Sequence, residues 1–221
     1  LSLRMTGNKI GNKGGMLFAS MLQINSTLEE LDLGDCDLFL PTASKIMPIH
    51  GADLCIFSRI LVSLQLQTNI YLCFKEDTTV HLSEMLRVNS TLQELHLSKH
   101  EITDFGVQRL CDALHENHTL KYLNLSCNKI TRDGVKYLAE VLKINKTLEI
   151  LDLASNRMED DGALYLAEAI YLYNRSLKAL SVVSNNISGK GLQALAAAIK
   201  ANNCLLYIYI WGNKINQEAS M

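Results

Sequence analysis

The stretch TLKYLNLSCNKITRDG at residues 119–134 decides the fold of this chain, because its apolar residues follow the spacing L-x-x-L-x-L-x-x-N-x-I. Alternate residues of an extended strand face the same side, so Leu123 and Leu125 are predicted to enter a core together. The polar residues TRDG then lead to Leu138 and Leu142, an apolar pair with the spacing that is typical of a helix. This part of the sequence therefore predicts a short strand, a turn and a helix.

The same pattern recurs along the whole chain, and eight copies can be aligned. Most neighbouring copies begin about 28 residues apart, a period that predicts a leucine-rich α/β solenoid. Such a solenoid is a horseshoe with a concave parallel β-sheet and convex helices, here of about eight repeats. The central strand positions are Leu3, Leu31, Leu64, Leu95, Leu123, Leu151, Leu180 and Ile208.

A polar column follows each strand. Asparagine suits this position because its amide offers donors and an acceptor to backbone groups where the chain leaves the strand. Losing such a partner in a buried turn should cost about 1–3 kcal/mol. Cys36 is interpreted as a small buried substitute rather than a nucleophile, since Asp35 and Asp37 flank it. This structural ladder is predicted to contain Asn8, Cys36, Asn69, His100, Asn128, Asn156, Asn185 and Asn213.

The helices are predicted from their first turns and their apolar pairs. Thr103, Thr131 and Ser188 are good N-caps, and each precedes a helical pattern. The inner helix faces are marked by Phe18/Leu22, Leu82/Leu86, Leu110/Leu114, Leu138/Leu142, Leu166/Ile170 and Leu195/Ile199.

Residues 39–78 depart from the regular pattern. The two intervals on either side of Leu64 are longer than all the others, and both prolines fall in this segment. An inserted loop, a distorted repeat and a gene-model error all remain open as explanations. We otherwise expect residues 1–221 to form a single domain that is part of a longer array, because residue 1 enters partway through a repeat and the last copy stops at Met221.

The cysteines and the N-x-Ser/Thr triplets bear on the compartment. Six scattered cysteines suit a reducing environment. Seven triplets taken alone would suggest a glycosylated protein. However, Asn25, Asn89, Asn117, Asn145 and Asn174 all fall in one recurring turn, so the repeat itself explains them. We expect an intracellular protein of the cytoplasm, the nucleus or both.

Several function classes are disfavoured. The net charge is −2, and the basic column Lys9, Lys129, Arg157 and Lys214 is sparse, so nucleic-acid binding is not expected. No apolar run reaches the length of a membrane span. His96 and His100 do not converge as zinc ligands would, so we expect no metal. No catalytic constellation and no cofactor motif is found, and we expect no enzymatic activity.

The helix-bearing repeat, with its period of about 28 residues, resembles the ribonuclease-inhibitor-like leucine-rich repeat family. This family includes ribonuclease inhibitor, the Ran GTPase-activating protein and the sensor domains of NOD-like receptors. The likeness covers nearly the whole chain, and the stretches 126–134, 174–187 and 207–214 carry it most clearly. The resemblance implies an intracellular horseshoe that recognises proteins through its concave face.

Residues that alternate with the core leucines of each strand are predicted to form the recognition surface. Aromatic residues dominate interface hot spots, and the last copy offers Tyr207, Tyr209 and Trp211. The alternative for Trp211 is packing on a neighbouring repeat. The N-terminal side is acidic, which could steer a basic partner, although a solvated acidic face is equally compatible. The other candidate contact residues are Tyr122, Glu30, Asp32, Asp35, Asp37, Glu94 and His96.

The sequence thus predicts a scaffold that binds a protein partner of unknown identity, for which a basic surface is one option. Two alternatives stay open. One is a GTPase-activating regulator resembling the Ran GTPase-activating protein, and the other is an architectural component of a large assembly such as a cilium or axoneme. The oligomeric state is not predicted.

Overall fold

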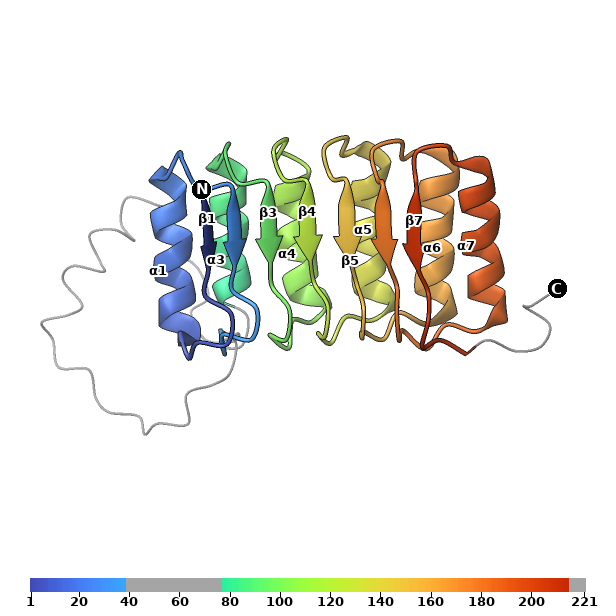
Figure 1. Ribbon diagram of the computed structural model, residues 1–221, viewed down its shortest axis with the longest axis horizontal. Helices are drawn as coiled ribbons and strands as arrows, with labels where there is room; N and C mark the ends of the chain where they lie inside the picture. Colours follow the sequence, from blue (N-terminus) through green and yellow to red (C-terminus); the bar gives the residue numbers. More distant parts are fainter. Residues whose placement is uncertain (39–76, 215–221) are drawn as a thin grey trace, which may run out of the picture.

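A computed structural model describes residues 1–38 and 77–214 of the chain. In these residues seven short strands form one parallel sheet in chain order, and six helices pack along one side of it (Figure 1). The strands are β1 (Ser2–Arg4), β2 (Glu30–Asp32), β3 (Glu94–His96), β4 (Tyr122–Asn124), β5 (Ile150–Asp152), β6 (Ala179–Ser181) and β7 (Tyr207–Tyr209). The helices are α1 (Gly11–Ile24), α3 (Asp77–Val88), α4 (Asp104–Leu114), α5 (Arg132–Ile144), α6 (Glu159–Leu172) and α7 (Gly189–Ala201).

The register of the sheet confirms the predicted repeat. The middle residue of each strand pairs with the middle residue of the next, so that Leu95, Leu123 and Leu151 lie in one row. These three leucines are fully buried because they point toward the helices. The two outer residues of each strand face away from the helices, onto what we call the concave face. The predicted leucine-rich solenoid is therefore the fold of the chain.

The sheet passes from β2 to β3 without a strand between them. Leu31 pairs directly with Leu95, although the two residues lie far apart in the sequence, and α1 packs against α3. One repeat therefore comprises both β2 and α3. The described sheet contains seven strands, one fewer than the eight expected. The expected copy centred on Leu64, with its ladder residue Asn69, lies outside the described residues.

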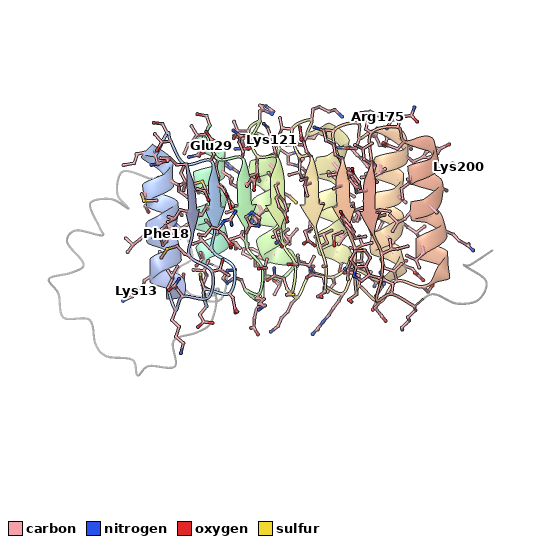
Figure 2. The ribbon with its side chains drawn as sticks, viewed as in Figure 1. Lys13, Phe18, Glu29, Lys121, Arg175 and Lys200 are labelled. Atoms are coloured by element: carbon pink, nitrogen blue, oxygen red, sulfur yellow. The ribbon has the colours of Figure 1, made fainter. Side chains whose placement is uncertain are left out.

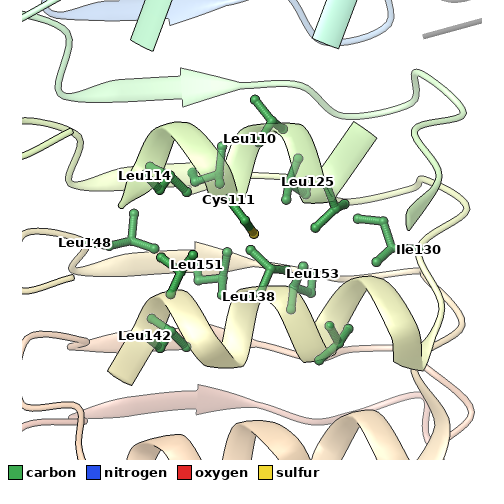
Figure 3. Close-up of a cluster of buried hydrophobic side chains, with 14 of the residues drawn as sticks. Leu110, Cys111, Leu114, Leu125, Ile130, Leu138, Leu142, Leu148, Leu151 and Leu153 are labelled. Carbon is green, nitrogen blue, oxygen red and sulfur yellow. The ribbon is translucent and has the colours of Figure 1, made fainter. Parts of the chain in front are cut away.

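Leucines from the strands and helices fill the space between the two layers. Figure 3 shows Leu151 and Leu153 from the β5 repeat facing Leu138 and Leu142 of α5. Cys111 of α4 is buried in the same cluster, and its burial raises the pKa of its thiol. The predicted apolar helix pairs are buried or partly buried in this core.

A left-handed residue precedes the ladder position in every described repeat. Non-glycine residues rarely adopt positive φ, and this conformation costs roughly 1 kcal/mol. This backbone conformation turns the chain immediately after the strand, and the ladder side chain that follows can then hydrogen-bond to the backbone at the end of the strand. The residues are Gly7, Asp35, Lys99, Cys127, Ser155, Ser184 and Gly212, with φ between 52° and 77°.

None of the helices in the described part of the chain has the length and hydropathy that a membrane span requires.

Candidate functional site

The ladder side chains hold the ends of the strands in place. The amide nitrogen of Asn128 donates to the carbonyl oxygens of Leu97 and Leu125 at 2.9 Å each. Its oxygen accepts from the backbone N–H groups of His100 and Ile102. A single buried side chain therefore links two adjacent repeats. Asn156, Asn185 and Asn213 also donate to a carbonyl of the preceding repeat.

Two ladder positions differ from asparagine, and a third lies at the edge. The Cys36 thiol donates to the carbonyl of Met5 at 3.0 Å, and burial raises the pKa of this thiol. Nε2 of buried His100 lies 2.6 Å from the carbonyl oxygen of Leu33. Asn8 is exposed, and its side chain donates within its own turn, to the carbonyl of Met5. The ladder is therefore most complete in the C-terminal half of the sheet.

We expect the free energy of unfolding to fall in mild acid because of His100. Burial lowers the pKa of this imidazole below its ordinary 6.5. Below about pH 6.5, the His100 imidazole therefore binds a proton more readily in the unfolded chain than in the folded chain. The free energy of unfolding then decreases as pH falls, by at most about 1.4 kcal/mol per pH unit. His100→Asn should remove this contribution and keep a donor for Leu33. Urea unfolding at about pH 7.5 and about pH 5.5 measures the free energy of unfolding of wild type and of His100→Asn. The control variant is His118→Asn, at an exposed position. If wild type and His100→Asn lose the same free energy of unfolding between the two pH values, the assignment to His100 is wrong.

A second row of asparagines, predicted only as the source of the glycosylation triplets, secures the opposite ends of the strands. Asn117 donates to the carbonyl of Leu86 in the preceding repeat, and its oxygen accepts from the backbone N–H groups of Thr119 and Leu120. The recurrence of Asn in every such turn was the signal that could have revealed this role. The other members are Asn25, Asn89, Asn145, Asn174 and Asn202.

Aspartates from one repeat also cap helices in the next. The Asp160 carboxylate accepts from the backbone N–H and the hydroxyl of Ser188, and from the N–H of Gly191. Partial burial raises the pKa of Asp160, but these hydrogen bonds outweigh it and hold the pKa below its ordinary value. Asp104 makes the same contacts at the first turn of α5. Hydrogen bonds between repeats therefore hold the turns at both ends of the strands, and the first turns of α5 and α7, in a defined arrangement.

The aromatic candidates lie together at the C-terminal end of the concave face. Tyr207 and Trp211 are each 60% exposed, and Tyr209 is 40% exposed. The rings of Tyr209 and Trp211 meet edge to face at 5.2 Å between centroids. Large exposed aromatic side chains on a concave sheet are unusual without a binding role.

Tyr122 of β4 stands apart from this group across a shallow hollow. Its ring packs edge to face against His96, with centroids 4.6 Å apart. The hollow has a volume of about 260 Å³, and Tyr122 lines it together with Tyr209 and Trp211. The small side chains of Ala179 and Ser181 on β6 leave this space open. These two residues were not predicted from the sequence, although small side chains between bulky neighbouring strands are a readable signal. Ile150, Leu151 and Asp152 complete the lining.

The acidic candidates are more neutralised than the sequence suggested. Glu30 accepts a hydrogen bond from Arg4 at 2.7 Å, and this bond lowers the pKa of Glu30. Lys99 pairs with Asp35 at 3.1 Å. Asp35 and Asp37 lie beyond the end of β2 with left-handed backbones, rather than on the strand itself. Asp32 and Glu94 are the acidic candidates that remain on strands and face the concave side without a lysine or arginine partner in the described residues.

Three acidic and imidazole groups gather near β2 and β3. Ligand atoms of Glu30, Glu94 and His96 lie within 4.8 Å of one another. Nε2 of His96 is 3.6 Å from a carboxylate oxygen of Glu94. Glu30 already forms an ion pair with Arg4, and the positive charge of Arg4 disfavours a metal cation at this place. We therefore assign no metal to these residues.

A second, larger hollow of about 530 Å³ follows the turns that precede the strands. Figure 2 shows Glu29 and Lys121 of this hollow along one edge of the solenoid. Its charges are mixed, because Lys121 and Lys146 alternate with Glu29 and Glu149. Its lining therefore favours neither a cationic nor an anionic ligand. It differs in this from the hollow lined by Tyr122, Tyr209 and Trp211, which we call the aromatic hollow.

A family model described as Leucine Rich repeat matches residues 1–19, 25–38, 88–111, 116–139, 145–167 and 173–196. Leucine-rich repeat-containing protein 34 from Mus musculus is 53% identical over 187 residues, which cover 85% of this chain and 44% of that protein. The protein of the same name from Homo sapiens is 59% identical over 143 residues, which cover 65% of this chain and 31% of that protein. The chain therefore matches less than half the length of these relatives.

Among solved structures, the one titled Leiomodin-1 Actin-Binding Site 2 is similar, with a TM-score of 0.55 and 26% sequence identity. The match covers 58% of this chain and 76% of that one.

Proposed function

Because this chain belongs to the leucine-rich repeat family, we propose that it is a non-enzymatic interaction module that binds a protein partner on its concave face. The proposal rests on one observation above all, the exposed aromatic group of Tyr207, Tyr209 and Trp211 on and after β7. Burying such side chains against a partner contributes roughly 2 kcal/mol or more for each central residue.

The hydrogen bonds and buried leucines that hold the concave face support this function. Few side chains of the concave face need to support the fold, because the two asparagine rows and the buried leucines do so. A preorganised surface loses little conformational entropy on binding, which favours affinity. A catalytic role would instead be supported by a nucleophile paired with a base, and the lining of the aromatic hollow offers the carboxylate of Asp152 with no histidine, cysteine or lysine beside it.

We further propose that the protein functions inside the cell, in the cytoplasm or nucleus. The triplet asparagines Asn89, Asn117, Asn145 and Asn174 are buried and donate hydrogen bonds from their amide nitrogens. A glycan attached there during secretion would prevent these turns from forming. The described cysteines, among them buried Cys111, form no disulfide bond with one another.

The test compares proteins that co-purify with the tagged chain and with the triple variant Tyr207→Ala, Tyr209→Ala and Trp211→Ala. We expect at least one partner to be lost from the triple variant while its melting temperature stays within about 2 °C of wild type. A variant that keeps every partner contradicts the proposal. A changed melting temperature would instead indicate that Trp211 packs on a neighbouring repeat, and that aromatic contact would then be structural.

A matched control removes three tyrosines from the helical side of the solenoid. Tyr137, Tyr171 and Tyr173 are exposed to a similar degree, at 39%, 50% and 47%. Changing all three to Ala should leave the concave partner bound. Loss of partners from this variant alone would favour the architectural alternative, in which the helices contact a larger assembly such as a cilium or axoneme.

Two specific partners can be assayed directly. Resemblance to the Ran GTPase-activating protein suggests a small GTPase, and unchanged GTP turnover in the presence of the chain would exclude this role for each GTPase assayed. The likeness to a leiomodin-1 structure whose title names an actin-binding site suggests actin. Co-sedimentation with filamentous actin and binding to monomeric actin would test it, with the aromatic triple variant as the control for the concave face.

A further inference from the structure

The hollow between β4 and β7 combines aromatic walls with a small-residue floor. Tyr122 stands on one side, and the Tyr209–Trp211 pair on the other. Ala179 and Ser181 lie between them on β6 and provide the depth. The aromatic rings on both sides have packing partners, because His96 packs on Tyr122 and Tyr209 packs on Trp211. With a volume of about 260 Å³, the hollow is large enough to receive one large side chain.

The charge of the hollow is negative. Asp152 lines it, and in the described residues this carboxylate forms no ion pair, with one oxygen accepting from the N–H of Ala154. The strands β3 to β7 contain no lysine or arginine. Burial raises the pKa of Tyr122, and the negative charges of Asp152, Glu94 and Asp32 raise it further.

We propose that this hollow receives a positively charged side chain, an arginine or a lysine, of the protein that binds the concave face. The proposal rests on the function proposed above and specifies which chemical group of the partner enters the site. A cation is attracted to the faces of Tyr and Trp rings, and the attraction is strongest where the cation is partly desolvated. The carboxylate of Asp152 would add a charge-assisted hydrogen bond. An anionic side chain would meet Asp152 without a compensating cation, so the hollow disfavours it.

The experiment uses Trp211, which is the one tryptophan of the chain, as a local reporter. Its fluorescence is titrated with a short capped peptide that contains arginine between glycines. The same peptide with citrulline in place of arginine is the control, because citrulline has nearly the same shape without the charge. We expect the arginine peptide to change the Trp211 emission, and the citrulline peptide to bind at least about fivefold more weakly. A lysine peptide should behave like the arginine peptide.

Two variants locate the binding. Asp152→Asn and Tyr122→Ala should each weaken arginine binding by about fivefold or more. Glu84→Gln removes an exposed carboxylate on α3, outside the hollow, and should not change the affinity. Equal effects of Asp152→Asn and Glu84→Gln would show general charge attraction and would overturn the proposal.

The outcomes also separate this inference from the proposed function. If arginine and citrulline bind equally, or if neither changes the emission up to about 10 mM, the hollow does not select a cation. If a partner that co-purifies with wild type is then still lost from the triple variant Tyr207→Ala, Tyr209→Ala and Trp211→Ala, a binding site on the concave face remains supported. If capture does not depend on the triple, while the arginine peptide binds as expected, the hollow is a cation site and the proposed docking face is wrong.

Discussion

Asn128→Ala is expected to lower the free energy of unfolding by about 3–5 kcal/mol, since it removes buried hydrogen bonds that each contribute about 1–3 kcal/mol when a partner is left unsatisfied. The backbone N–H groups of His100 and Ile102 lose their acceptor, and the carbonyl oxygens of Leu97 and Leu125 lose a donor. No water reaches this turn easily, because Asn128 is only 7% exposed. Urea unfolding followed by circular dichroism measures the loss.

The control is Asn203→Ala, at an exposed turn position next to buried Asn202. It should change stability by less than about 0.5 kcal/mol. The variant Asn128→Asp keeps the acceptor for the backbone N–H groups but places a buried carboxylate oxygen against the carbonyl oxygens of Leu97 and Leu125, so it should be at least as unstable as Asn128→Ala. Equal stability of Asn128→Ala and Asn203→Ala would show that the ladder does not hold the repeats together.

Leu151→Ala should lower the free energy of unfolding by about 2–5 kcal/mol. This leucine is fully buried at the centre of β5, where Figure 3 shows it among leucines of α5. Its removal creates a cavity that fixed strands on both sides cannot close. Because repeats stabilise one another through neighbouring contacts, the unfolding transition should also broaden as the array separates into two units. Urea unfolding followed by circular dichroism measures both effects.

The adjacent residue provides the comparison. Ile150 precedes Leu151 on the same strand but is 37% exposed on the concave face. Ile150→Ala should cost less than about 1 kcal/mol, because much of its surface already meets water. A similar cost for both variants would contradict the assignment of the two faces.

Much of this architecture could be read from the sequence because identical physical demands recur in every repeat. Leu123 and Leu125 alternate into the core, and Asn128 has to satisfy backbone groups, so each position constrains its residue type. The regular repeats were predicted in register. The number of strands in the described sheet was not, because pairing of Leu31 with Leu95 depends on contacts between distant parts of the chain.

The candidate site was less readable. Exposure of Tyr207, Tyr209 and Trp211 follows from strand alternation, and the prediction that they bind a partner stays a prediction. The pairing of Arg4 with Glu30 could not be predicted, because it depends on the register between neighbouring strands. The hollow was not foreseen either, although the small side chains of Ala179 and Ser181 between bulkier strands were a signal for it.

The two rows of asparagine amides have a consequence for how such a protein can change over time. Asn117 and Asn128 contact mainly main-chain groups, which every substitution elsewhere leaves in place. Strand residues on the open side, such as Ser181, are thus released from the task of maintaining the fold. Mutations can accumulate there and alter partner preference without first passing through an unstable intermediate. In such a solenoid, one set of residues maintains the fold, and a different set can change to give a new binding surface.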